Sequence, residues 1–181
     1  ARTEEELAYL QRRIEAISKD GGEIIATIFT HRHQDHIGDF SKLEQIYSAP
    51  IWCAKETFDV IPNYDTNRIL KDEEVISLKS PKGKVNWKVH YTPGHCPGHI
   101  CLESDRYVIS GDLAVMVGTI LIPSSDGNMD EYIKSLRRIR SLGPSMLFPA
   151  HGPFTHQPAK LLDKYISHRE GRHNRILEAL T

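Results

Sequence analysis

Residues 30–39 read THRHQDHIGD and hold three histidines and one carboxylate within six positions. They directly follow the apolar run IIATIF at residues 24–29, whose β-branched residues predict a strand. Side chains alternate along an extended chain, so His31 and His33 point the same way and can share one ion. This pattern predicts a metal site rather than a histidine-rich surface loop.

The same stretch favours a site for two ions. Asp35 and His36 come two and three residues after His33, where the chain must turn towards a helix that Asp39 would cap. Such a turn can aim both side chains at a second ion about 3.5–4 Å from the first, the spacing of two-metal hydrolytic sites.

Three later motifs each place a metal-competent side chain just past a short apolar strand. They read TPGHCPGH at 92–99, SGD at 110–112 and PAHGP at 149–153. Loops at the strand ends of a rigid scaffold are where binding residues usually sit. Four such motifs in this order indicate a common metal centre.

The order HxHxDH, GHxxGH, SGD and PAHGP resembles the metallo-β-lactamase superfamily, and the motifs lie within residues 27–153. The resemblance implies an α+β fold, the αββα sandwich of that superfamily, and two zinc ions per chain, with iron or manganese as alternatives. It assigns one ion to His31, His33 and His95, and the other to Asp35, His36 and His151. Asp112 would bridge the two ions, with a hydroxide opposite.

These ligand identities discriminate among branches of the superfamily. A bridging Asp112 is similar to the glyoxalase II, ribonuclease and phosphodiesterase branches, whereas true zinc β-lactamases typically have a cysteine there. His33 departs from the flavodiiron pattern, which usually has a glutamate, and the mononuclear persulfide dioxygenases stay open. The stretch LLDKYISHR at 161–169, with the Arg172, Arg175, Ile176 and Leu177 that follow, resembles the β-lactamase-like protein 2 group.

The resemblance also predicts where domain boundaries fall. A superfamily domain normally opens with two or more strands before the first metal motif, but residues 1–30 read as one helix and one strand. We therefore expect a sandwich lacking its opening strands over residues 1–157. Residues 158–181 are expected to form a C-terminal helix that leads towards a winged-helix-like segment.

Periodicity and turn residues predict the elements. A capping box at Thr3 and Glu6 begins an amphipathic helix that Gly21 ends. Residues 55–72 read as loop, partly helical, and Gly171 either interrupts the helix that begins at Pro158 or lies within it. The expected strands are 23–29, 51–53, 74–78, 85–91, 100–103, 107–110 and 146–148, and the other helices are 40–47 and 129–142.

Composition fits one globular domain outside the membrane. Hydrophobic residues make up 39% of the 181 and charged residues 26%, and no apolar run approaches the roughly 20 residues of a spanning helix. A net charge of −1 gives no general attraction to nucleic acid. Three cysteines without framework spacing indicate reduced thiols and a cytoplasmic protein.

The predicted function is a dinuclear metal-dependent hydrolase in which a metal-bridging hydroxide attacks a small ester or thioester, as in hydroxyacylglutathione hydrolases. Asp35 would orient the nucleophile or accept its proton, and Cys96 is not expected to take part. His99 reads equally as an outer-shell partner of the metal ligands or as a structural core histidine. A homo-oligomer stays open.

Two alternatives stay open beside this prediction. One is an endoribonuclease on single-stranded RNA, and the other is a non-catalytic fragment that binds metal or RNA. The last helix has a basic face, which reads as solvated surface or as a contact for phosphates, formed by Lys160, Lys164, Arg169, Arg172 and Arg175. The sequence shows no strip of aromatic and basic residues such as single-strand binders use.

Overall fold

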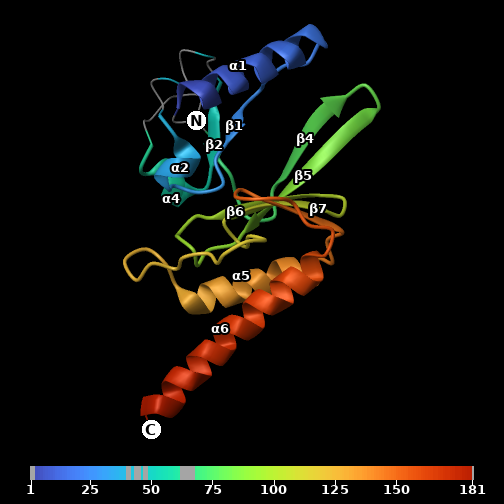
Figure 1. Cartoon of the computed structure of the whole chain (residues 1–181). Helices are drawn as coiled ribbons and strands as arrows, with labels where there is room; N and C mark the ends of the chain where they lie inside the picture. The colour runs from blue at the N-terminus through green and yellow to red at the C-terminus, as the bar shows by residue number, and fades with distance from the viewer. Residues whose placement is uncertain (1–2, 40–41, 43–45, 47–48, 62–67, 181) are drawn as a thin grey trace. The chain divides into compact units, whose positions relative to one another are not determined.

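The computed structural model describes residues 3–39, 42, 46, 49–61 and 68–180 (Figure 1). The chain forms two compact units, unit 1 from Ala1 to Leu70 and unit 2 from Lys71 to Thr181. Helices and strands both contribute, so the fold is α+β, as predicted. Most of the predicted helix 40–47 lies outside the described residues. Among the described residues, every helix is too short or too polar to cross a membrane.

Unit 1 begins with the predicted amphipathic helix, α1 (Glu4–Lys19). The capping box forms as predicted, since the Glu6 N–H donates to Thr3 Oγ1 and the Thr3 N–H donates to Glu6 Oε2, both at 3.2 Å. Three glutamates in the first turn complement the positive end of the helix dipole. Gly21 then ends the helix with a φ of +77°, a conformation that favours glycine.

The sheet of unit 1 is parallel and has the order β1-β2-β3. Its strands are β1 (Thr27–Ile28), β2 (Ile51–Cys53) and β3 (Arg68–Ile69), and a short helix α4 (Lys55–Phe58) follows β2. The strand predicted over 23–29 therefore shrinks to two residues, and β3 lies in a segment predicted to be loop-like. A small buried cluster packs beside this sheet, formed by Phe29, Ile37, Ile51, Cys53 and Ile61.

Unit 2 contains a five-stranded sheet of order β4-β5-β6-β7-β8, antiparallel except for the parallel pair β7–β8. All five strands fall where the sequence predicts them. Their bounds are β4 (Val75–Ser80), β5 (Gly83–Tyr91), β6 (Ile100–Ser104), β7 (Tyr107–Gly111) and β8 (Met146–Pro149).

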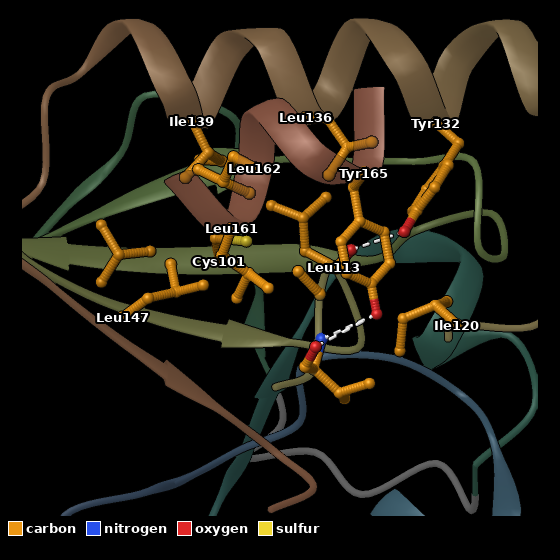
Figure 2. Packing of buried hydrophobic residues seen from close by; sticks show 13 residues of the cluster. Cys101, Leu113, Ile120, Tyr132, Leu136, Ile139, Leu147, Leu161, Leu162 and Tyr165 are labelled. Carbon is orange, nitrogen blue, oxygen red and sulfur yellow. Dashed lines mark hydrogen bonds between the residues drawn. The ribbon is translucent and has the colours of Figure 1, made fainter. Parts of the chain in front are cut away.

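Helices α5 (Met129–Ser141) and α6 (Pro158–Leu180) pack beside each other on this sheet (Figure 1). Strand side chains that face the helices, such as Cys101 and Leu147, are fully buried with Leu136 and Leu162 (Figure 2). Ion pairs Arg137–Glu170 and Arg140–Asp163 hold the two helices together at their surface. The helix that begins at Pro158 runs through Gly171 without interruption.

Arg138 of α5 fastens the first residues of unit 2 to the sheet. Its guanidinium donates to Asp72 Oδ2 at 2.9 Å and to the Tyr91 carbonyl at 3.0 Å, and it pairs with Glu73. Partial burial by itself raises the pKa of the Asp72 carboxyl. Hydrogen bonds from Arg138 and from the Tyr91 N–H outweigh that effect and hold this pKa below its usual range.

We expect Arg138→Met to lower the free energy of unfolding by about 1 kcal/mol near neutral pH, since partly exposed ion pairs contribute up to about that much. The lowered pKa of Asp72 stabilises the fold above the ordinary carboxyl pKa of about 3.9, and that contribution is lost as the pH falls through the lowered value. Urea unfolding at several pH values should therefore show the variant approaching wild type in acid. Lys134→Met, an exposed cation on the same helix, is the control, and an equal effect of both substitutions would refute this role.

Candidate metal centre

The predicted ligands form two sets, one in each unit. His31, His33, Asp35 and His36 lie in unit 1, directly after β1. The His31 ring is buried, with its centroid 4.9 Å from that of His33 and 3.8 Å from that of His36. His31 and His33 are therefore close neighbours, as the alternation of an extended chain predicts.

The turn after His33 differs from the prediction. The chain enters a four-residue helix, α2 (Gln34–Ile37), at once, with His33 as its N-cap residue. The Gln34 side-chain amide donates to the Gly38 carbonyl at 2.9 Å and closes the turn, and Gly38 adopts a φ of +68°. Asp35 and His36 are thus presented by a helical turn, with Asp35 Oδ2 3.6 Å from His36 Nε2.

Asp112 and His151 of unit 2 come from the ends of two neighbouring parallel strands. Asp112 follows β7 and His151 lies two residues after β8. Carboxyl ends of parallel strands lie at the same edge of a sheet, and the Ala150 N–H donates to the Gly111 carbonyl at 3.0 Å beyond the ladder. A bridge between Leu147 and Thr155 closes the loop that presents His151.

The Asp112 carboxylate lies between two imidazoles. Its Oδ2 is 3.6 Å from His95 Nε2, and its Oδ1 is 3.5 Å from His151 Nε2. Asp112 and His95 are buried, whereas the His151 side chain is 52% exposed. One carboxylate thus directs a different oxygen at each of two nitrogen ligands, an arrangement that suits a bridging carboxylate.

Helix α5 positions the loop that carries His95. Ser135 Oγ donates to the Pro93 carbonyl at 2.7 Å, and the Asn128 N–H donates to the Gly94 carbonyl at 2.8 Å. A Cβ on Gly94 would lie 2.2 Å from the Tyr132 backbone nitrogen, and Gly94 has a φ of +126°. Only glycine fits this position, so the close approach of α5 depends on the residue just before His95.

The tautomer of His95 follows from its hydrogen bond. Nδ1 lies 2.7 Å from the Leu121 carbonyl oxygen, which can only accept, so Nδ1 carries the proton. In the neutral ring Nε2 then presents its lone pair on the side of Asp112. This is the arrangement of a metal-bound histidine whose second nitrogen is held by a backbone carbonyl.

Comparison with known proteins decides the family. The sequence model described as "Metallo-beta-lactamase superfamily" matches residues 2–151. The chain belongs to the metallo-β-lactamase superfamily. Its fold is accordingly the α+β fold of that superfamily. The membership also explains why its four motifs occur in the order typical of the superfamily.

Two curated relatives and one solved structure illustrate the similarity. The chain is 28% identical to "Beta-lactamase-like protein 2 homolog" of Drosophila melanogaster, over 94% of this chain and 59% of that protein. It is 27% identical to "Atrochrysone carboxyl ACP thioesterase" of Aspergillus fumigatus, over 87% and 47%. The structure of TTHA1623 in a di-iron-bound form matches with a TM-score of 0.66 and 22% identity, over 88% and 82%. The chain thus spans about half to three-fifths of the length of these curated relatives.

His99 of the GHxxGH motif fixes the backbone of Asp112 through a hydrogen bond. Its Nε2 accepts the Asp112 backbone N–H at 3.0 Å, so the proton of the neutral ring lies on Nδ1, which faces Thr92 Oγ1 at 2.8 Å. His99 is fully buried, and both of its nitrogens bond to the protein. Of the two roles that the sequence left open, this geometry favours a partner of the outer shell.

Burial keeps the thiols of two of the three cysteines protonated, and the third, Cys96, directly follows His95. All three cysteines lie among the described residues, are buried and form no disulfide. Burial raises the pKa of Cys53 to about 12 and that of Cys101 to about 12, so neither is a thiolate near neutral pH.

Asp112→Ala should reduce the metal content of the protein, because it removes the carboxylate shared by His95 and His151. We expect about two equivalents of metal in wild type, as in two-metal hydrolases, and the loss of at least one in the variant. Mass spectrometry on protein purified without added metal measures both. His156→Ala, an exposed histidine outside the ligand sets, should change nothing, and full metal content in Asp112→Ala would contradict the assignment.

Proposed function

We propose that this chain is a metal-dependent hydrolase with a dinuclear centre. The observation that carries the proposal is the Asp112 carboxylate, whose two oxygens each lie within 3.6 Å of a different imidazole nitrogen. In the proposed centre His31, His33 and His95 hold one ion, and Asp35, His36 and His151 hold the other. Two bound cations would lower the pKa of a shared water and polarise the bond to be cleaved.

The residues of the chain contribute position and proton transfer. Asp35 keeps 48% of its side chain exposed, so its carboxylate is accessible to a water molecule that it can orient or deprotonate. The Leu121 carbonyl fixes the His95 ring and keeps its ligand atom directed, and His99 holds the backbone of Asp112. Since the thiols of Cys53 and Cys101 are buried and protonated, a covalent cysteine intermediate on either residue is disfavoured.

A small ester or thioester is the substrate that we propose. Support comes from the thioesterase name of the Aspergillus relative and from the bridging-carboxylate arrangement, which resembles the glyoxalase II branch. Zinc suits the histidine and carboxylate ligands, and iron is the alternative because the related structure of TTHA1623 is a di-iron-bound form.

The purified chain should hydrolyse acyl thioesters of glutathione, and Asp112→Asn should lower kcat/KM by about 100-fold or more, since electrostatic stabilisation of the transition state is lost. A thiol-release assay with matched metal content measures this, and His168→Ala, an exposed histidine of α6, is the control. Metal binding without turnover of any ester, thioester or RNA would identify the chain as a non-catalytic fragment and refute the hydrolase.

Cleavage of single-stranded RNA is the second candidate, and a row of aromatic rings favours it. Tyr107, Phe148, Phe154 and His156 follow one another with ring centroids 6.3, 5.8 and 5.2 Å apart. Tyr107 is 47% exposed and Phe154 is 52% exposed. The row contains no lysine or arginine, so it differs from the strip of aromatic and basic residues that the sequence lacks, and its rings come together from separate segments. Exposed rings of this kind stack nucleobases.

Phe154→Ala should weaken binding of single-stranded RNA by about 1–3 kcal/mol if bases stack on this row. Fluorescence anisotropy with a short oligonucleotide measures the affinity, and Val117→Ala, an exposed apolar residue outside the row, is the control. Equal RNA affinity of wild type and Phe154→Ala would remove the support that the row gives to this candidate.

A further inference from the structure

Arg169 of α6 is a buried cation, although the sequence placed it on an exposed basic face. Its side chain points inward and the residue is 8% exposed, whereas Lys160, Lys164, Arg172 and Arg175 are exposed. The guanidinium lies 5.7 Å from the centre of the Tyr132 ring, a cation–π distance. Burying a charged guanidinium costs free energy unless hydrogen bonds compensate for the lost water, so Arg169 needs specific partners.

Its partners lie in the loop between β7 and α5. Arg169 Nη2 donates to Thr119 Oγ1 at 3.0 Å and to the Ile120 carbonyl. The next residue is Leu121, whose carbonyl accepts the Nδ1 hydrogen of His95 at 2.7 Å. One peptide unit therefore separates the carbonyl that Arg169 holds from the carbonyl that orients a candidate metal ligand.

The start of this loop is fastened to the helices by two tyrosines. Tyr132 Oη donates to the Leu113 carbonyl at 2.7 Å, and Tyr165 Oη bonds to both the N–H and the carbonyl of Val115 at 3.2 Å (Figure 2). These bonds hold the segment just after Asp112. Other contacts hold the part of the loop that follows Val115.

The middle of the loop, residues 116–121, is largely exposed to solvent. Residues 116–119 are exposed, Leu121 is 72% exposed, and Gly118 adopts a φ of +88° with open space around it. Ile120 is buried beside Tyr165 (Figure 2). Ile122 also packs against the core, and beside these apolar contacts the Arg169 hydrogen bonds hold Thr119 and the Ile120 carbonyl directly before Leu121. A planar guanidinium can reach two acceptors at once.

We propose that Arg169 is a positioning residue for His95. By holding Thr119 and the Ile120 carbonyl, it fixes the Leu121 carbonyl, which in turn fixes the tautomer and ring orientation of His95. Helix α6 thereby becomes part of the candidate centre, although it carries none of the metal motifs. The inference rests on the ligand role proposed for His95. The His95 tautomer that it predicts can be measured in the metal-free protein.

The first test reads the His95 tautomer directly. Long-range proton–nitrogen NMR of metal-free protein at about pH 8, above the ordinary histidine pKa of about 6.5, distinguishes the two neutral forms. Wild type should show His95 protonated at Nδ1 alone, and Arg169→Met should show a mixture. Arg172→Met removes the same charge from an exposed position on the next turn and should match wild type.

The second test reads metal affinity. Titration calorimetry with zinc should show about 10- to 100-fold weaker binding of one ion in Arg169→Met, the range that outer-shell partners typically contribute. Arg169→Lys, which keeps one donor, should fall between wild type and Arg169→Met. Arg172→Met should again bind like wild type.

The two tests distinguish a failure of the role proposed for Arg169 from a failure of the proposed dinuclear centre. If Arg169→Met keeps the wild-type tautomer and affinity, the positioning role is overturned. If no variant binds metal, the dinuclear proposal fails, while the NMR arm still decides the role of Arg169. If Arg169→Met does not fold, Thr119→Val, which removes one acceptor at an exposed position, should still broaden or split the His95 signals. An unchanged His95 spectrum in Thr119→Val would then overturn the proposal.

Discussion

The parallel pairing of β7 with β8 is the constraint on which the ligand set of unit 2 depends. Parallel neighbours require a crossover, and here residues 112–145 run from one strand to the next and include α5. The pairing brings Asp112 and His151 to one edge of the sheet. The crossover also covers one face of the sheet with α5 and supplies Leu121, the partner of His95. One topological feature thus organises two candidate ligands and the orientation of a third.

Backbone groups fix the same tautomer in His95 and His99, with the proton on Nδ1, but they do so through different ring nitrogens. His95 gives its Nδ1 hydrogen to the Leu121 carbonyl, so its Nε2 is free of a proton and can bind metal. His99 uses its Nε2 to accept the Asp112 N–H and is thereby committed to the protein. Two histidines four residues apart in one motif therefore have different roles, and the difference lies in which backbone atom faces each ring.

The sequence predicted the elements that carry strong periodicity and clear turn residues. The strand expected at 85–91 is β5 (Gly83–Tyr91), and the helix expected at 129–142 is α5 (Met129–Ser141). Strands β1 and β3 have two residues each, too few for an alternating pattern, so their bounds could not be predicted. The inward direction of the Arg169 side chain could not be predicted either. The sequence does not show which side of α6 is buried, so it does not distinguish Arg169 from the other four cations of the helix. The candidate ligands were predictable because their motifs are local.

The two ligand sets differ in what organises them. The set in unit 1 lies within six residues, and its geometry follows from one strand end and the turn of α2. The set in unit 2 comes from three separate segments, and tertiary contacts must hold them together: Ser135 on Pro93, His99 on Asp112, and the Leu113–Leu121 loop on α5 and α6. Packing defects in the core of unit 2 therefore reach His95 and Asp112 through named hydrogen bonds.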